Sequence, residues 1–258
     1  MTDRIQSDAL IDSEQLQKAH YDRIAKEYEA HYNDACSQQY RVKFQYEPMF
    51  AGIELAGNRV LEAMCGSGHT TQYLLSKGAY VTGLDISPQE IKSFRQHWPK
   101  CDAICASALD SNLESSSFDC IVISGGLHHV HPHLNEVVRE MHRILKPRGY
   151  FCFVEPHAGS LPDVIRKQWY KHDHLFANNE AAIDVKALKK EFASSFDFNF
   201  EKYLGSVGYL FVLNSMVFRI PLSLKPIYTP LMLKLESLFG KVQGELLSCV
   251  VVAQWQKK

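Results

Sequence analysis

The stretch Arg59-Val60-Leu61-Glu62-Ala63-Met64-Cys65-Gly66-Ser67-Gly68-His69-Thr70-Thr71 decides the fold expected for this chain. Val60 and Leu61 predict the end of a short buried strand, and the small residues up to Gly68 predict a tight turn into a helix. A strand that enters a helix through such a turn brings backbone N–H groups and a helix N-terminus close to a ligand. The carboxylate of Glu62 beside the turn needs a positively charged or hydrogen-bond-donating partner, and an amino group on a ligand would serve.

Length and composition are those of a folded globular protein. The chain has 258 residues, of which 46% are hydrophobic and 22% are charged, so one large α/β domain with insertions is expected rather than two small ones. A formal net charge of −1 provides no basic field that would draw the chain to nucleic acid. We therefore expect no nucleic-acid partner, and a chain that is a monomer or a homodimer.

The cysteines and the N-terminus indicate a reducing compartment. None of the seven cysteines belongs to a C-x-x-C pair, and Cys120, Cys152 and Cys249 lie in apolar, strand-like runs, which favours free buried thiols over disulfides or a zinc site. The polar start, Met1 to Gln6, lacks a signal-peptide core. No run reaches the roughly 18 apolar residues that a membrane span needs. These observations predict a soluble, cytoplasmic protein without stable membrane insertion.

Apolar runs alternate with amphipathic segments along the middle of the chain. Buried strands are predicted at 80–84, 102–106, 118–123 and 150–154, and helices at 70–77, from Ser87 to before Pro99, and at 134–145. This alternation predicts βαβ units and an open parallel sheet, whose strands end along one edge where ligands bind. The residues at or just beyond those ends are Glu62, Asp85, Ser107, Ser124 and Glu155.

Further segments are predicted to flank this unit. Helices are expected at 13–33 and 39–51 before it; after His157 we expect a helix at 185–192, a strand at 196–204, a helix at 229–239 and a strand at 246–255. The first helix is rich in tyrosine. Its residues Tyr21 and Tyr28 either pack at a half-exposed boundary or touch the ligand.

Asp85 indicates an adenosine-containing ligand. It falls nineteen positions after Gly66, at the end of the next strand, where a carboxylate can accept hydrogen bonds from both ribose hydroxyls. This feature alone suits a nicotinamide cofactor and S-adenosylmethionine (SAM) equally. The turn distinguishes the two cofactors, because a dinucleotide fingerprint needs a third glycine where this chain has Thr71. Glu62 also suits an α-amino group better than a pyrophosphate.

Six short motifs, in order along the chain, resemble the class I SAM-dependent methyltransferases, in particular the small-molecule, type 11-like group. They are Tyr21-Asp22-Arg23-Ile24-Ala25, Val60 to Gly68, Val81 to Ser87, Ser117-Phe118-Asp119, Leu127-His128-His129-Val130 and Arg143 to Gly149. The resemblance covers about Tyr21 to Val154 and the last strand. It implies an α/β, Rossmann-like fold with a mostly parallel seven-stranded sheet flanked by helices, an N-terminal helical cap and an insertion before the last strand.

The resemblance also implies one methyltransferase domain over residues 1–258. Within it, 1–50 would be the helical cap, 51–156 the SAM-binding core, 157–245 an insertion that helps to form the acceptor pocket, and 246–258 the final strand.

For the cofactor, the resemblance implies contacts on both sides of the first turn. Glu62 would lie near the SAM amino group, Asp85 would hold the ribose, and Ile86 would pack on the adenine. Ser107 and Ala108 would lie at the adenine edge, with the Ser124 carbonyl near the sulfonium. The residues whose backbone would surround the methionyl part are Ala63, Met64, Cys65, Gly66 and Gly68.

Three positions depart from the family pattern. Met64 stands where the family usually has its first glycine, so either the turn is reshaped or Met64 lies against the cofactor. Ser107 replaces a common aspartate at the adenine amino group. Arg148 replaces a common glycine far from the chemistry. None of these changes removes Glu62 or Asp85.

The histidines after the fourth strand are the candidate catalytic groups. Similar O-methyltransferases use a histidine at the His128-His129 pair, and an imidazole can accept a proton at neutral pH, so either residue is a candidate base. The alternatives are that His129 braces the loop and that positioning alone suffices without a base. His131 and His133 are expected to be solvated. The spacing of these histidines does not suit a zinc site, and no metal is expected.

The acceptor is expected to be small and apolar or aromatic, because apolar and aromatic residues gather between Pro156 and Leu246. A natural product, a sugar derivative or a quinone-like lipid, methylated on oxygen or nitrogen by in-line SN2 transfer from SAM to leave S-adenosylhomocysteine, fits this composition. A non-catalytic SAM-binding or scaffold protein is an alternative. A nicotinamide-dependent oxidoreductase is another, and Thr71 argues against it.

Overall fold

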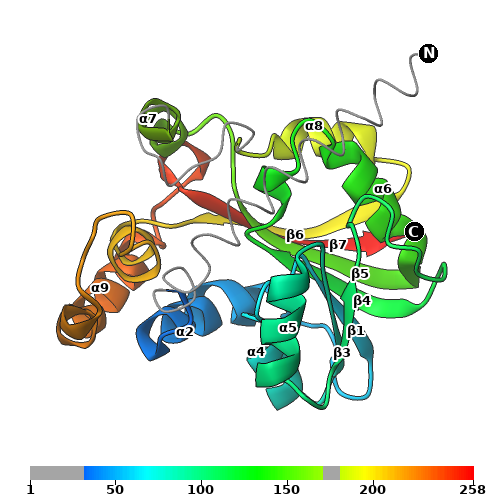
Figure 1. The fold of residues 1–258 in the computed structure, drawn as a ribbon. Coiled ribbons are helices and arrows are strands. Elements are labelled where there is room, and N and C mark those ends of the chain that lie inside the picture. Colours follow the sequence, from blue (N-terminus) through cyan, green and yellow to red (C-terminus); the bar gives the residue numbers. More distant parts are fainter. Residues whose placement is uncertain (1–31, 171–180) are drawn as a thin grey trace.

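A seven-stranded sheet forms the centre of the molecule in the computed structural model, which describes residues 32–170 and 181–258 (Figure 1). The strand order is β3-β2-β1-β4-β5-β7-β6. Strands β1 to β5 pair in parallel, and β7 is antiparallel to both of its neighbours. The prediction of a mostly parallel, Rossmann-like sheet is confirmed. The strands are β1 (Arg59–Ala63), β2 (Tyr80–Asp85), β3 (Asp102–Cys105), β4 (Phe118–Ser124), β5 (Leu145–Pro156), β6 (Phe196–Leu204) and β7 (Val250–Lys257).

Helices cover both faces of the sheet. On one face lie α6 (Leu134–Ile144) and α8 (Val185–Glu191); on the other lie α4 (Thr71–Ser76) and α5 (Pro88–His97) (Figure 1). The residues of β5 alternate between these two layers. Phe151 and Phe153 pack toward α6, and Cys152 and Val154 pack toward α4 and α5. The near-continuous apolar runs seen in the sequence therefore belong to strands that are buried on both faces.

The helical segment before the sheet starts earlier than predicted. It consists of α2 (Ala35–Arg41), a π-helical turn η1 (Val42–Tyr46) and α3 (Glu47–Met49). Asp34 caps it by accepting hydrogen bonds from the N–H groups of Cys36 and Ser37. The predicted helix at 13–33, with Tyr21 and Tyr28, lies outside the described residues apart from its last two positions.

The second half of the chain differs most from the sequence expectation. Helix α7 (Leu161–Tyr170) was not predicted, and α9 (Lys225–Phe239) begins four residues before the expected start. Pro226 lies in the first turn of α9, where backbone N–H groups have no intrahelical acceptor. A proline without an N–H is therefore tolerated there, and it begins the helix rather than breaking it. A 3₁₀ turn, η5 (Glu245–Leu247), occupies the expected start of the last strand, and β7 begins only after it.

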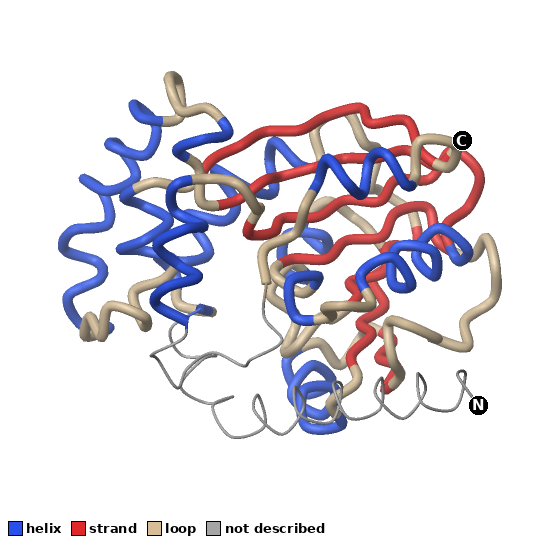
Figure 2. The backbone as a smooth tube through the Cα atoms, turned by 90° about the horizontal axis from the view of Figure 1, so that it is seen from above, coloured by secondary structure: helices blue, strands red, loops and turns tan. Residues whose placement is uncertain are grey.

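A helical lobe joins α2 to α9 beside the sheet. It includes the π-helical turn η3 (Tyr209–Leu213) and the 3₁₀ turn η4 (Leu222–Leu224). Figure 2 shows these helices gathered on the left, beyond the ends of the strands. Buried polar contacts hold the lobe together: Lys225 Nζ donates to Ser37 Oγ at 2.8 Å, and Tyr40 donates to Glu236 Oε1 at 3.1 Å.

Each helix within residues 32–170 and 181–258 is too short or too polar to cross a membrane.

Candidate functional site

Glu62 anchors the turn between β1 and α4. Its side chain is buried at the end of β1, where Oε1 accepts from the Thr70 N–H at 2.8 Å and Oε2 accepts from the Thr71 hydroxyl at 2.5 Å. Burial raises the pKa of Glu62 to about 7, although these hydrogen bonds oppose the shift. The carboxylate therefore fixes the first residues of α4. Its predicted contact with a ligand amino group stays a prediction.

The turn itself depends on residues with left-handed backbone. Gly68 has φ of 93°, and a Cβ there would lie 2.9 Å from Phe94 Cε2 and closer still to the Trp98 ring, so only glycine fits. Met64 adopts φ of 55°, a conformation that favours glycine. A Cβ on Gly126 would lie 2.9 Å from Met64 Sδ, so the methionine packs directly over this glycine of the next loop. The turn thus has a left-handed backbone at Met64 and carries a side chain there.

Asp85 lies at the end of β2 and joins this turn to the next helix. Its Oδ2 accepts from the Gly66 N–H at 2.9 Å, and its Oδ1 accepts from the Ser87 N–H at 2.9 Å. Ser87 in turn caps α5 by accepting from the Glu90 N–H, as the Ser87-Pro88-Gln89-Glu90 pattern predicts. The carboxylate is therefore held at the carboxyl edge of the sheet, half-buried and close to the turn.

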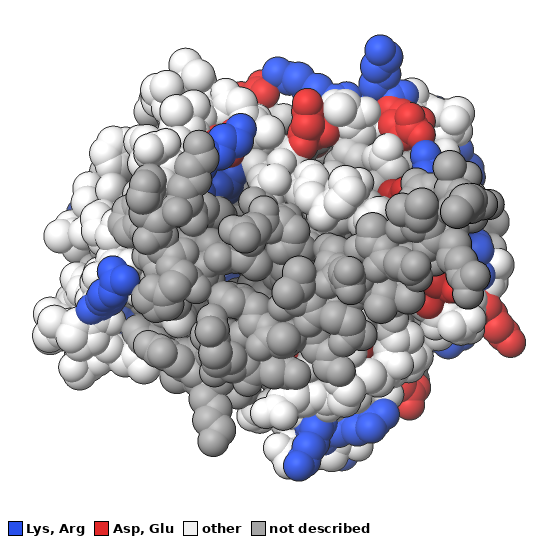
Figure 3. Space-filling view, turned by 45° about the horizontal axis from the view of Figure 1, so that its top comes forward, with Lys and Arg blue, Asp and Glu red and all other residues white. Residues whose placement is uncertain are grey.

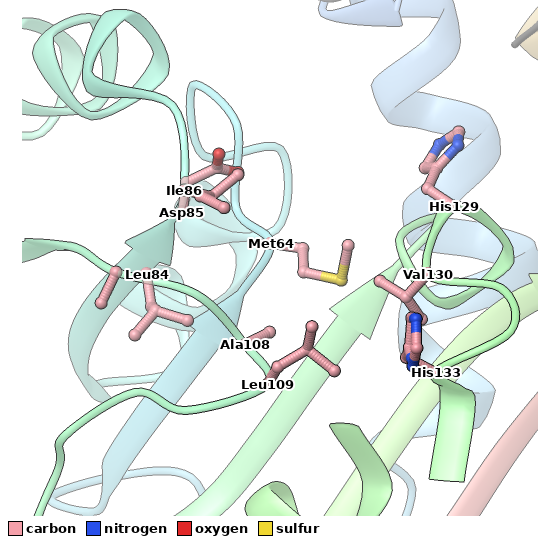
Figure 4. Close-up of a pocket in the computed structure, with 10 residues that line it drawn as sticks. Met64, Leu84, Asp85, Ile86, Ala108, Leu109, His129, Val130 and His133 are labelled. Carbon is pink, nitrogen blue, oxygen red and sulfur yellow. The ribbon is translucent and has the colours of Figure 1, made fainter. Parts of the chain in front are cut away.

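A hollow of about 540 Å³, including its open mouth, lies beside Asp85. Its wall is mostly apolar, and Met64 extends across it from the β1 side toward Val130 and His133 (Figure 4). Five predicted site residues line it: Met64, Asp85, Ile86, Ala108 and His129. Sequence reasoning missed the others, which lie near the end of β2 or follow β3 and β4: Leu84, Ala106, Leu109, Val130 and His133.

Two predicted residues lie elsewhere in the site region. Ser107 does not line the hollow; its hydroxyl accepts from the Leu109 N–H at 3.0 Å and shapes the loop after β3. The Ser124 hydroxyl interacts with the buried Tyr46 hydroxyl, which also donates to the His69 carbonyl at 3.2 Å. Sequence reasoning missed Tyr46 because it is brought to the sheet edge by α2 and the π-helical turn, 78 positions before Ser124.

The histidine loop is built on Glu155, which is fully buried at the end of β5. Its Oε1 accepts from the N–H groups of Gly126 and Leu127 at 2.7 and 2.8 Å. Its Oε2 lies 2.7 Å from His128 Nδ1. Burial raises the pKa of Glu155 to about 7. The turn η2 (Leu127–His129) is thereby fixed at its N-terminus, and the His128 ring is oriented by a carboxylate.

The other histidines differ in their surroundings. The His129 ring lies against the His128 ring with centroids 3.7 Å apart, and it is buried beside the hollow. His131 and His133 are half-buried, so the expectation that they are solvated is wrong. His157 is buried, and its Nε2 contacts the Ser248 carbonyl oxygen at 3.0 Å. Within residues 32–170 and 181–258, no group of three or more His, Cys, Asp or Glu side chains is placed to hold a metal ion.

The side chains that line the hollow have the chemistry that an adenosine needs. A carboxylate at the end of β2 can accept hydrogen bonds from ribose hydroxyls, and the apolar wall formed by Leu84, Ile86, Ala106 and Ala108 can enclose a flat base. Beside it lies the turn from Cys65 to Gly68, whose Gly66 N–H donates to Asp85. An acceptor carboxylate beside an apolar wall is the set of groups that the adenosine part of SAM would need.

Comparison with known proteins finds methyltransferases. Residues 61–153 match the model of a methyltransferase domain family. An uncharacterized methyltransferase of Synechocystis is 35% identical over 105 residues, which are 40% of this chain and 50% of that protein. A probable phthiotriol/phenolphthiotriol dimycocerosates methyltransferase of Mycobacterium ulcerans is 36% identical over 107 residues, 40% of this chain and 41% of that protein. The chain thus spans about half or less of the length of these relatives.

The fold is also found in solved structures. The N-methyltransferase NodS of Bradyrhizobium japonicum, crystallised with S-adenosyl-L-homocysteine, matches with a TM-score of 0.56 over 87% of this chain and 89% of that chain. Its sequence identity to this chain is 12%, so the likeness is one of fold.

Proposed function

We propose that this chain, which carries a class I SAM-dependent methyltransferase domain, transfers a methyl group from SAM to an oxygen or nitrogen atom of a small acceptor, with His128 as general base. The observation that carries the proposal is the pairing of the His128 imidazole with the buried Glu155 carboxylate, 2.7 Å away, next to a hollow that fits an adenosine. When bound, SAM supplies an electrophilic methyl group on a sulfonium.

The residues that would hold the cofactor follow from the hollow. Asp85 would accept hydrogen bonds from the ribose, and Ile86 and Ala108 would enclose the adenine. The backbone from Ala63 to Gly68 would surround the methionyl part. Glu62 lies beneath that turn, where the lone pairs left by Thr70 and Thr71 could accept from an ammonium group.

His128 acts by taking a proton from the acceptor. Because Nδ1 faces Glu155, the N–H of the neutral ring belongs on Nδ1, and Nε2 is the basic nitrogen. The carboxylate also stabilises the imidazolium that forms when Nε2 accepts the proton. Glu155 is thus a positioning residue. His129, packed against the His128 ring, limits its rotation and forms part of the wall of the hollow.

The proposed acceptor is small and apolar or aromatic. The lobe formed by α2, η3 and α9 lies beyond the ends of the strands, and its apolar core includes Tyr40, Tyr209 and Met216. The Mycobacterium ulcerans relative is named for phthiotriol and phenolphthiotriol dimycocerosates, which favours an acceptor with hydroxyl groups on an apolar body. A quinone-like lipid or an apolar natural product fits this description.

Calorimetry and mass spectrometry test the proposal. We expect S-adenosylhomocysteine to bind and NADH not to bind, and a library of phenols, amines and sugars to yield a product heavier by one CH₂ group. His128→Ala should lower turnover on the order of 100-fold for weakly acidic hydroxyls. The loss should be smaller for acidic phenols, which ionise without a base. His97→Ala, at the exposed end of α5, is the matched control and should leave turnover unchanged.

Three outcomes would contradict parts of the proposal. Binding of NADH alone would favour an oxidoreductase. Binding of S-adenosylhomocysteine with no methylated product across the library would favour a non-catalytic SAM-binding protein. Unchanged turnover in both His128→Ala and His129→Ala would remove the base.

A further inference from the structure

Helix α9 is buried on one side and exposes apolar side chains on the other. Its inner face packs into the lobe through Thr229, Leu233 and Glu236, which are buried. On the opposite side Ile227, Leu231 and Leu238 are 76%, 56% and 52% exposed, and Val242, just past the helix end, is 83% exposed. Spacings of four, seven and four residues place these side chains in one row of a 3.6-residue repeat. Monomeric soluble proteins seldom expose such a contiguous apolar row, which marks an interaction site.

The charges of this outer face are all positive. Lys234 and Lys241 fall in the same row, between the apolar residues, and both are exposed. Glu236 is the only acidic residue between 209 and 244 in the sequence. It is buried on the inner face, where it accepts from the Tyr40 hydroxyl and from the N–H groups of Ser206 and Gly208. In Figure 3 the left-hand side of the molecule, where α9 lies in Figure 1, is white with blue among it and no red.

We propose that this outer face of α9, formed by Ile227, Leu231, Lys234, Leu238, Lys241 and Val242, docks on the surface of an anionic lipid bilayer. An apolar row with flanking lysines is the pattern of a helix that lies in the plane of the interface, with its apolar side chains at the acyl boundary and its cations at anionic head groups. The 15 residues of α9 are fewer than the roughly 20 that a membrane span needs, so the helix lies flat.

A second copy of the chain fits this face less well. A two-fold contact would place the same surface on both sides, so the lysines of each copy would face the lysines of the other. Glu236 is turned inward and cannot offset them. An anionic bilayer supplies the opposite charge that the face lacks.

Docking through α9 would place the helical lobe between the bilayer and the candidate functional site. The inner face of α9 packs on η3 and α2. Strands β4 and β5 run opposite to β7, and their carboxyl ends point toward this lobe (Figure 1). The acceptor would then be a lipid-borne molecule, a conclusion that rests on the proposed function. The docking itself requires no bound cofactor.

Vesicle flotation with the full chain tests the docking. We expect the wild-type protein to float with vesicles of mixed phosphatidylglycerol and phosphatidylcholine, but not with phosphatidylcholine alone, and to dissociate at high salt. Leu231→Asp/Leu238→Asp and Lys234→Glu/Lys241→Glu should each lower partitioning by roughly tenfold or more. The control Lys92→Glu/Lys100→Glu makes the same charge change on and just beyond α5 and should float like the wild type. Circular dichroism melting should show all variants folded.

Hydrogen exchange of the wild-type chain gives a second measurement that needs no variant. Peptides covering 225–242 should exchange more slowly with phosphatidylglycerol vesicles than without them, and α5 peptides should not change. The proposal is overturned if the wild type fails to float, if all variants float equally, or if size exclusion shows a dimer that only the α9 variants dissociate. Calorimetry with S-adenosylhomocysteine on the same samples separates the two proposals: vesicle binding without cofactor binding would overturn the proposed function and leave the docking intact.

Discussion

Glu62 and Glu155 use the same structural device at two places on the sheet edge. Each lies near the end of a strand and is buried, and each accepts from backbone N–H groups of a turn at this edge: Glu62 from Thr70, and Glu155 from Gly126 and Leu127. Burial raises the pKa of both carboxyls to about 7. The two turns that they hold lie on either side of the hollow.

The difference between them is the side chain that each carboxylate contacts. Glu62 meets a threonine hydroxyl, which does not titrate near neutral pH, whereas Glu155 meets the imidazole of His128. The contacts of Glu62 with the protein therefore fix a turn after β1, whereas those of Glu155 fix the turn after β4 and also bring the carboxyl next to a second titratable group. A carboxylate at a strand end gains a chemical role from its neighbour rather than from its position.

The largest effect is expected when Glu155 is removed. Glu155→Ala leaves the N–H groups of Gly126 and Leu127 without their acceptor and the His128 ring without its partner, which should lower the free energy of unfolding by about 3–5 kcal/mol. Glu155→Gln keeps an acceptor oxygen and should lose less. Urea denaturation measures both. If the alanine variant is as stable as the wild type, Glu155 does not hold the loop.

The pH dependence of stability distinguishes the two carboxylates. Each has a pKa of about 7 in the folded chain and an ordinary value of 4.5, so the folded state binds the proton more tightly. The resulting stability is fully present below pH 4.5 and is lost as the pH rises through 7, by about 3 kcal/mol for each group. Urea denaturation across this range should show the loss.

Glu62→Gln removes the contribution of Glu62 to this pH-dependent loss of stability and leaves that of Glu155. Its amide does not titrate, so the fall in stability between pH 4.5 and 7 should be smaller than in the wild type by about 3 kcal/mol. Glu155→Gln should change the profile less simply, because His128 also loses its charged partner. A wild-type profile in Glu62→Gln would mean that Glu62 is ionised throughout, and the likeness between the two carboxylates would fail.

A smaller effect tests whether the two turns are coupled to each other. Gly126→Ala would bring a Cβ within 2.9 Å of Met64 and of Ile123 Cγ2, and should cost about 1–3 kcal/mol of stability. Met64→Gly removes the side chain from that contact and relieves the left-handed backbone of Met64. The double variant should recover part of the loss, with Ile123 accounting for the remainder. A double-mutant cycle with no interaction energy would show that the turns are independent.

The parts of the fold that depend on local chemistry could be predicted from the sequence. Strands β1 to β4 and helix α5 follow from buried apolar runs and from the Ser87 cap, whose acceptor and donor are three residues apart. Helix α7 was missed because Leu161, Val164 and Ile165 are exposed, so its apolar residues form no buried stripe. The start of α9 was misplaced because the role of Pro226 depends on where the helix begins.

The residues of the hollow that sequence reasoning found lie mostly at strand ends. Met64, Asp85 and Ile86 were found because they follow β1 and β2 in a recognisable order. The donors to Glu155 were not predicted, because Glu155 and Gly126 lie 29 positions apart and meet only when β4 and β5 pair. Periodicity and turn chemistry report on residues that are close in the chain, whereas the donors to Glu155 lie in the loop after the neighbouring strand.

The smallest predicted effect concerns Ser87, which provides a neutral counterpart to both carboxylates. It caps α5 at the same edge of the sheet, but its hydroxyl accepts from the Glu90 N–H at 3.2 Å without carrying charge. Ser87→Ala should lower the free energy of unfolding by about 1 kcal/mol, by the same amount below pH 4.5 and above pH 7. Ser93→Ala, in the middle of the same helix, is the control and should change stability by only a few tenths of a kcal/mol. If the effect of Ser87→Ala varied with pH as that of Glu62→Gln does, the pH dependence would arise from capping at this edge in general rather than from the buried protons of Glu62 and Glu155.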